Sequence, residues 1–261
     1  MNNIKSTIEN RKGPLLNIYF TAGYPELDST ARIIESLDRH GVDLIEIGMP
    51  YSDPMADGPV IQKSSARAIR NGLTLNKLFE QIRSVVPGVK TPLIMMGYLN
   101  QMMQYGEEKF LKTAVSCGIQ GLIIPDLPPE LYEEQYRQMF LDQGIEIIFL
   151  VTPQTSERRI RYIDEISDSF LYAVSDSSIT GGTSAINDAQ IAYFQRLRNL
   201  DLKNPFMVGF GISDHVSFRQ VTEEAPGAIV GSAFIKSLEK VKTEKDLDEV
   251  IRDFVRSIKK G

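Results

Sequence analysis

Three carboxylates fall within one short stretch of the chain, residues 42–62, which reads VDLIEIGMPYSDPMADGPVIQ. Glu46 stands in a run of apolar residues with an isoleucine on each side, as in a buried strand. Burying a carboxylate is costly unless it is paired, and apolar surroundings would raise its pKa toward neutrality, so Glu46 is a candidate acid–base catalyst. Asp53 and Asp57 follow in a loop rich in glycine and proline, where each could also be a turn former or a helix cap.

Three glycine-rich segments in the second half of the chain could bind an anion. They are residues 180–183 (TGGT), 209–213 (GFGIS) and 231–233 (GSA). Glycine lets backbone N–H groups approach an anion closely, and the start of a helix adds the positive end of its dipole. The same glycines could instead only make tight turns. Together the three segments favour a phosphorylated small molecule as the ligand.

Several reaction and ligand classes are disfavoured by what the sequence lacks. No lysine stands at the C-terminal end of an expected strand, which disfavours a Schiff-base aldolase. His40 and His215 are far apart and Cys117 is the single cysteine, so a catalytic metal with nitrogen or sulfur ligands is not expected. No dinucleotide-binding fingerprint follows an expected strand. A net charge of −5 argues against nucleic acid as the main binding partner. No membrane span or secretory signal is recognised, and we expect a cytoplasmic protein.

The elements that must position these residues alternate regularly along the 261 residues. Short, nearly continuous apolar runs predict eight strands, and amphipathic patterns predict helices between them. The expected strands are residues 15–20, 42–47, 92–96, 121–124, 146–151, 170–174, 205–209 and 228–230. Strands of this kind belong to a parallel sheet that is buried on both faces. We expect a (β/α)₈ TIM barrel that forms one domain over residues 1–261, with a doubly wound open sheet as the alternative.

A (β/α)₈ barrel carries its chemistry at the C-terminal ends of the strands and in the loops that follow them. Glu46 lies near the end of the second expected strand, and Tyr172 lies within the sixth. Asp53 and Asp57 lie in the loop after the second strand, and the glycine-rich segments follow strands six, seven and eight. The pattern therefore predicts carboxylate acid–base chemistry on a phosphorylated substrate.

The residues resemble the tryptophan synthase alpha subunit family over nearly the whole chain. The most specific part is EIGMPYSDPMADGPVIQ (46–62), supported by FTAGYP (20–25), PDLPPE (125–130), GFGIS (209–213) and GSA (231–233). The resemblance implies cleavage of indole-3-glycerol phosphate to indole and glyceraldehyde 3-phosphate, a retro-aldol reaction without a cofactor in this chain.

The resemblance also implies roles for individual residues. Glu46 would be the general acid–base, Asp57 would interact with the indole N–H, and Tyr172 would lie close to the substrate. The phosphate would be bound by Gly181, Gly211, Gly231 and Ser232, and the indole pocket would be lined by Tyr19, Met95, Tyr98 and Ile124.

The family works as an α₂β₂ complex in which the beta subunit holds pyridoxal phosphate, so a beta-subunit partner is expected. Pro50 and Asp53 match positions that couple the two subunits. The chain departs from the family after the third strand, where Gln101 follows Asn100 and many members carry proline. Two alternatives stay open. One is another phosphate-binding barrel, such as indole-glycerol-phosphate synthase or phosphoribosylanthranilate isomerase, and the other is a non-catalytic subunit that only activates a beta subunit.

Overall fold

The strands form one parallel sheet that is wrapped into a cylinder. A computed structural model of the chain describes residues 3–54, 57–174, 186–209, 211–243 and 246–260. The strands are β1 (Leu15–Thr21), β2 (Leu44–Gly48), β3 (Leu93–Met96), β4 (Ile119–Ile123), β5 (Glu146–Ile148), β6 (Leu150–Val151), β7 (Leu171–Val174), β8 (Phe206–Gly209) and β9 (Gly227–Val230). Their order in the sheet is β5-β4-β3-β2-β1-β9-β8-β7-β6, and every neighbouring pair is parallel.

The two ends of this order are consecutive in the chain, and this closes the barrel. Only Phe149 separates β5 from β6; β5 pairs with β4, and β6 pairs with β7. The Phe149 carbonyl accepts a hydrogen bond from the Tyr172 backbone N–H at 2.9 Å, so the interruption stays bonded to its neighbour. β5 and β6 therefore act as one interrupted strand. The predicted (β/α)₈ barrel is confirmed, and the open-sheet alternative is wrong.

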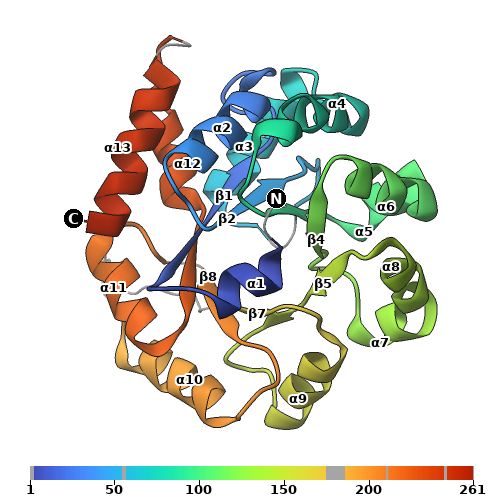
Figure 1. Ribbon diagram of the computed structural model, residues 1–261, viewed down its shortest axis with the longest axis vertical. Coiled ribbons are helices and arrows are strands. Elements are labelled where there is room, and N and C mark those ends of the chain that lie inside the picture. Colours follow the sequence, from blue (N-terminus) through green and yellow to red (C-terminus); the bar gives the residue numbers. More distant parts are fainter. Residues whose placement is uncertain (1–2, 55–56, 175–185, 210, 244–245, 261) are drawn as a thin grey trace.

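Helices surround the cylinder, as Figure 1 shows. They are α1 (Ile4–Glu9), α2 (Ser29–Arg39), α3 (Pro59–Arg70), α4 (Leu75–Val85), α5 (Leu99–Tyr105), α6 (Glu107–Ser116), α7 (Pro129–Leu131), α8 (Arg137–Gln143), α9 (Glu157–Ile166), α10 (Asp188–Asn199), α11 (His215–Glu224), α12 (Ser232–Leu238) and α13 (Asp246–Lys260). A single turn, η1 (Val86–Gly88), follows α4, and a π-helical turn, η2 (Tyr132–Tyr136), joins α7 to α8. No helix in the described ranges is long and apolar enough to cross a membrane.

Local capping explains where several helices begin. The side chains of Thr74, Ser156 and Asn187 accept hydrogen bonds from backbone N–H groups in the first turns of α4, α9 and α10. These three helices show the amphipathic patterns that predict helices between the strands. The seven residues of α5 are too few to show a helical period, so the sequence pattern does not predict this helix.

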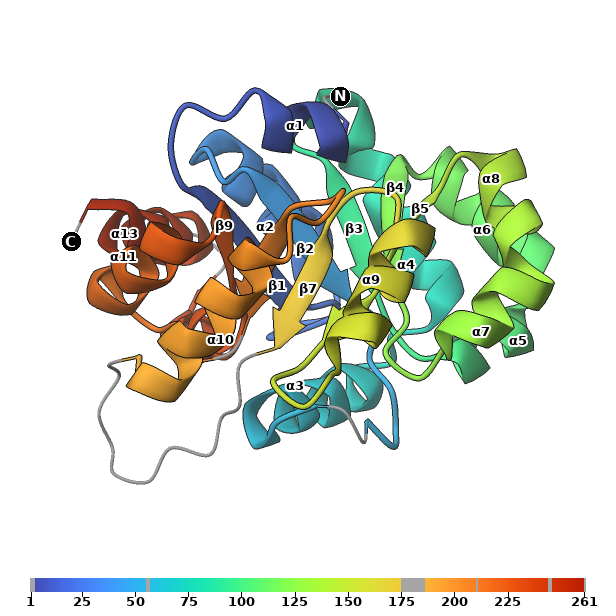
Figure 2. The ribbon, with the colours of Figure 1, turned by 90° about the horizontal axis from the view of Figure 1, so that it is seen from below.

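Helix α1 covers the N-terminal end of the barrel. Its Ile4 and Ile8 side chains are buried, and a Cβ placed on Gly121 of β4 would come within 2.8 Å of the Ile4 Cδ1 atom. Figure 2 shows α1 at one end of the strands and α3 at the other. The end near α3 is the C-terminal end of the strands, where the candidate chemistry lies.

Candidate active site

Glu46 projects from β2 into the barrel and is completely buried. Its strand neighbours in register are Tyr19 of β1 and Ile94 of β3. The Asn17 side-chain Nδ2 donates to the Glu46 Oε2 at 3.0 Å, and Oε1 has no hydrogen-bond partner in the described part of the chain. Burial raises the pKa of Glu46 to about 8, with the Asn17 hydrogen bond lowering it and the negative charge of Asp57 raising it.

Asp57 is half-buried and lies where the loop after β2 leads into α3. The Tyr98 hydroxyl donates to the Asp57 Oδ2 at 3.1 Å. Burial raises the pKa of Asp57 above its usual range, and the Tyr98 hydrogen bond opposes the rise. Its backbone is held as well, because the Asp57 N–H donates to the Pro54 carbonyl and the Gln62 side chain donates to the Asp57 carbonyl. The second carboxylate is thus fixed near the first.

Two tyrosines, Tyr19 and Tyr172, lie over glycines at the ends of strands. A Cβ on Gly48 would come within 2.2 Å of the Tyr19 hydroxyl oxygen, and one on Gly209 within 2.3 Å of the Tyr172 hydroxyl oxygen. Glycine at these two positions gives the rings the space they occupy. Burial raises the pKa of Tyr172 far above its usual range, and the nearby charge of Glu46 adds to the rise. Both tyrosines therefore lie near the carboxyl group of Glu46.

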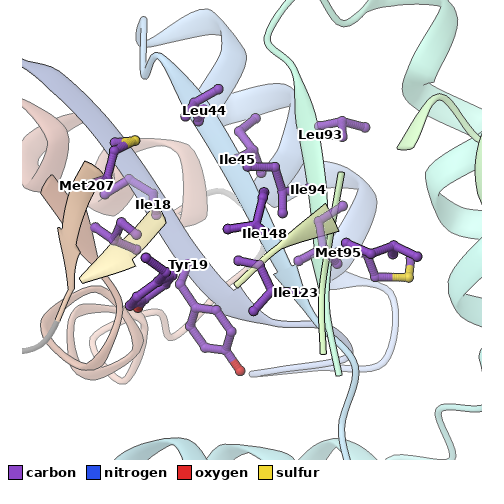
Figure 3. Close-up of a cluster of buried hydrophobic side chains, with 14 of the residues drawn as sticks. Ile18, Tyr19, Leu44, Ile45, Leu93, Ile94, Met95, Ile123, Ile148 and Met207 are labelled. Carbon is purple, nitrogen blue, oxygen red and sulfur yellow. The ribbon is translucent and has the colours of Figure 1, made fainter. Parts of the chain in front are cut away.

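The structure does not bring Met95 into the pocket assigned to indole. Met95 pairs in register with Ile47, and strand side chains alternate between faces, so Met95 faces away from the interior that holds Glu46. Figure 3 shows Met95 on the far side of β3 from Tyr19. Met96, the next residue, lies on the same face as Glu46. The prediction of Met95 is corrected to Met96.

The same one-residue offset affects Ile124. Ile124 lies one residue beyond the end of β4, whereas Ile123 pairs in register with Met96. In Figure 3, Ile123 lies between β3 and Tyr19. We therefore place Ile123, and not Ile124, on the interior face. A shift of one residue along a strand moves a side chain to the opposite face, which is why the sequence could not settle either position.

Gln101 ties the loop after β2 to the start of α5, a link that the sequence pattern did not reveal. Its Oε1 accepts from the Tyr98 backbone N–H at 3.0 Å, and its Nε2 donates to the Pro50 carbonyl at 3.0 Å. The Asn100 side chain donates to the Tyr51 hydroxyl at 3.2 Å, and the Tyr51 ring stacks on the Tyr98 ring at 4.9 Å between centroids. The departure from proline at position 101 was the available signal.

Three of the candidate phosphate-binding residues, Gly211, Gly231 and Ser232, lie at the mouth of the barrel. Gly211 is exposed and has a φ of +79°, a left-handed conformation that favours glycine, and it precedes α11. Gly231 lies against Tyr19 and precedes Ser232, the first residue of α12. The first N–H groups of a helix have no partner within it, so they are available to an anion. Gly181 lies outside the described residues.

Asp53 lies on the outer side of the loop, away from the carboxyl pair. It is exposed and borders a surface cavity of about 540 Å³. The lining residues are Tyr51, Ser52, Asp53, Pro54, Gln62, Ala66 and Ile69. Within the described ranges, no group of three or more His, Cys, Asp or Glu residues could hold a metal ion.

Comparison with known proteins identifies the family. The profile of the family described as "Tryptophan synthase alpha chain" matches residues 5–260. The chain belongs to this family. The tryptophan synthase alpha chain of Christiangramia forsetii is 52% identical over 94% of each chain, and that of Flavobacterium johnsoniae is 50% identical over 99% of this chain and 100% of its own.

Solved structures of the family have the same fold. Tryptophan synthase subunit alpha from Legionella pneumophila is 35% identical with a TM-score of 0.88, and the match covers 99% of this chain and 97% of that one. A chain of the tryptophan synthase α₂β₂ complex of Pyrococcus furiosus is 31% identical with a TM-score of 0.86, covering 94% and 97%.

Membership of the tryptophan synthase alpha chain family defines the reaction. The chain is a lyase of tryptophan biosynthesis that cleaves indole-3-glycerol phosphate to indole and glyceraldehyde 3-phosphate. The alternatives of another phosphate-binding barrel and of a non-catalytic subunit are set aside.

Proposed function

We propose that Glu46 carries out the proton transfers of this cleavage and that Asp57 stabilises the intermediate. Protonated Glu46 gives its proton to indole C3, which makes C3 tetrahedral and places positive charge on the ring N–H. The resulting carboxylate removes the proton from the side-chain hydroxyl next to the ring. The bond between C3 and the carbon that bore this hydroxyl then breaks. Its electrons restore the indole double bond, and the hydroxyl-bearing carbon becomes the aldehyde of glyceraldehyde 3-phosphate. Glu46 ends protonated, as it began.

The observation that carries this assignment is the environment of the Glu46 carboxyl group. Its pKa of about 8 keeps it protonated at neutral pH, and one carboxyl oxygen has no partner among the described residues. A group with this pKa can both donate and accept a proton near neutrality. Asp57 is suited to stabilising the intermediate. The Tyr98 hydroxyl favours the charged form of Asp57, and this carboxylate stabilises a positively charged indole ring.

The remaining residues are proposed to position the substrate. The phosphate would be bound by backbone N–H groups at Gly181, Gly211, Gly231 and Ser232. Tyr19, Tyr98, Met96 and Ile123 would enclose the indole ring. Tyr172, whose ring lies within reach of the charge on Glu46, would pack against the reacting carbons and help to exclude water.

The partner is proposed to be a tryptophan synthase beta subunit that holds pyridoxal phosphate, with no cofactor in this chain. Pro50 and Asp53 are proposed to couple the two subunits, because the loop that carries them also carries Asp57. Two exposed apolar side chains, Ile69 of α3 and Met103 of α5, support a protein contact beside that loop. We further propose that residues 1–261 form one domain and that the protein acts in the cytoplasm.

The test is an indole-release assay with purified protein and indole-3-glycerol phosphate, with and without a beta subunit. We expect indole from the wild-type chain and a loss of at least about 100-fold in kcat for Glu46→Gln, the usual scale for removal of an acid–base group. Circular dichroism would show that the variant is folded. Indole formation by folded Glu46→Gln at the wild-type rate would rule out the proposed role of Glu46.

A further inference from the structure

Asn17 is a polar side chain at a position where the barrel interior could hold an apolar one. It lies in β1 between Leu16 and Ile18 and is completely buried. Its Nδ2 donates to the Glu46 Oε2 at 3.0 Å, and its Oδ1 has no hydrogen-bond partner in the described part of the chain. Leaving a buried carbonyl oxygen unpaired is unfavourable for folding, so the amide at this position is not explained by stability.

The position of Asn17 fixes the side from which it contacts Glu46. Asn17 pairs in register with Leu44, and Tyr19, two residues further along β1, pairs with Glu46. Because side chains alternate between the two faces of a strand, those of Asn17 and Tyr19 point to the same face of the sheet. Asn17 therefore lies one layer deeper in the barrel than Glu46 and donates from beneath the carboxyl group.

We propose that Asn17 is a positioning residue that determines which oxygen of Glu46 carries the catalytic proton. This proposal rests on the proposed role of Glu46. A carboxyl oxygen that accepts an N–H bond acts as the carbonyl oxygen of the protonated acid, so the proton resides on the other oxygen. Because Oε2 is held by Asn17, the proton is on Oε1, which is left unbonded and can meet indole C3.

The same hydrogen bond helps Glu46 to cycle between its two forms. Burial and the charge of Asp57 both oppose the carboxylate, whereas the Asn17 N–H stabilises it. The other titratable groups facing Glu46 are the hydroxyls of Tyr19 and Tyr172, which stay neutral near pH 7. Asn17 is thus the identified group that favours the carboxylate, the form that must remove the hydroxyl proton.

The test replaces Asn17 with leucine, which has a similar shape, and with alanine, which avoids overpacking; neither side chain can donate a hydrogen bond. Activity with indole-3-glycerol phosphate would be measured from pH 6 to pH 10. We expect the alkaline limb of kcat/KM to move up by about one pH unit and kcat at pH 7 to fall about 10-fold, because the carboxylate loses its donor. The infrared carbonyl band of protonated Glu46, identified by subtracting the Glu46→Gln spectrum, should move to higher frequency.

A matched control is available at the other end of the barrel. Asn204 is also a buried asparagine, and its Nδ2 donates to the Asp164 Oδ1 at 3.0 Å, far in the fold from Glu46. Asn204→Leu should lower thermal stability without moving the pH profile. A profile and infrared band unchanged in both folded Asn17 variants would overturn this proposal, even with Glu46→Gln inactive. Full activity in Glu46→Gln would instead overturn the proposed function.

Discussion

Two glutamates of the barrel, Glu46 and Glu146, both have raised pKa values, but they lie toward opposite ends of the strands, and Glu46 is fully buried whereas Glu146 is half-buried. Glu46 lies two residues before the end of β2, and Glu146 begins β5. Burial is the largest cause of the raised pKa in both, to about 8 for Glu46 and about 7 for Glu146. Each has a buried oxygen without a partner in the described residues, and each lies near a second carboxylate with a raised pKa, Asp57 or Asp168.

The difference lies in what covers each glutamate. Glu146 faces the end of the barrel covered by α1, where Lys5 and the Ser169 hydroxyl lower its pKa. Glu46 faces the other end, where Tyr98 holds Asp57 and helices α11 and α12 begin. A raised pKa is therefore not sufficient to identify a catalytic residue. The loops around the carboxylate decide whether it can meet a substrate.

The largest expected effect comes from exchanging each glutamate for glutamine. Glu46→Gln should lose at least about 100-fold in kcat, whereas Glu146→Gln should stay within about threefold of wild type, because Glu146 faces the end of the barrel that α1 covers. The measurement is indole release at saturating substrate. A comparable loss of kcat in both variants would show that the two ends are not functionally distinct.

The second prediction concerns the free energy of unfolding as a function of pH. A carboxyl group whose pKa is raised by folding binds its proton more tightly in the native state, so stability falls as pH rises from about 4.5 through the folded pKa. The upper bounds are about 5 kcal/mol for Glu46 and about 3 kcal/mol for Glu146. Each glutamine variant should therefore gain stability over wild type at pH 9 relative to pH 5.

Urea unfolding of wild type, Glu46→Gln and Glu146→Gln at the two pH values would measure this difference. The gain should be larger for Glu46→Gln. Identical pH dependence in all three proteins would show that neither carboxyl group is perturbed by folding.

The smallest expected effect is on the pKa of Asp57, the carboxylate near Glu46. Tyr98→Phe removes the hydroxyl that favours ionised Asp57, so the pKa of Asp57 should rise and the acid limb of kcat/KM should move to higher pH. A hydrogen bond to a charged group is worth about 1.5–3 kcal/mol, so activity below neutral pH should fall about 10-fold or more. Tyr105→Phe, at the last residue of α5, the helix for which Tyr98 is the N-cap, is the control. An acid limb unchanged in Tyr98→Phe would contradict the assigned hydrogen bond.

The sequence by itself determined the fold class and singled out the stretch proposed to be catalytic. Strands that are apolar on both faces require cover on both faces, and eight of them alternating with helices fit a closed barrel. A carboxylate between two isoleucines, as at Glu46, is expected to be buried, and local structure does not explain why the free-energy cost of that burial is tolerated. The glycine-rich segments likewise follow the strands at which this architecture binds anions.

The tertiary structure alone decided which side chains meet. Met95 and Ile124 each required a one-residue correction, because the face of a strand residue depends on register with its neighbours. Asn17 is an ordinary polar residue in the sequence, and its contact with Glu46 joins different strands. The partial burial of Glu146 also could not be predicted from the sequence, because it depends on packing at the end of the barrel that α1 covers. Burial and pairing are non-local, and they set the pKa values on which the chemistry depends.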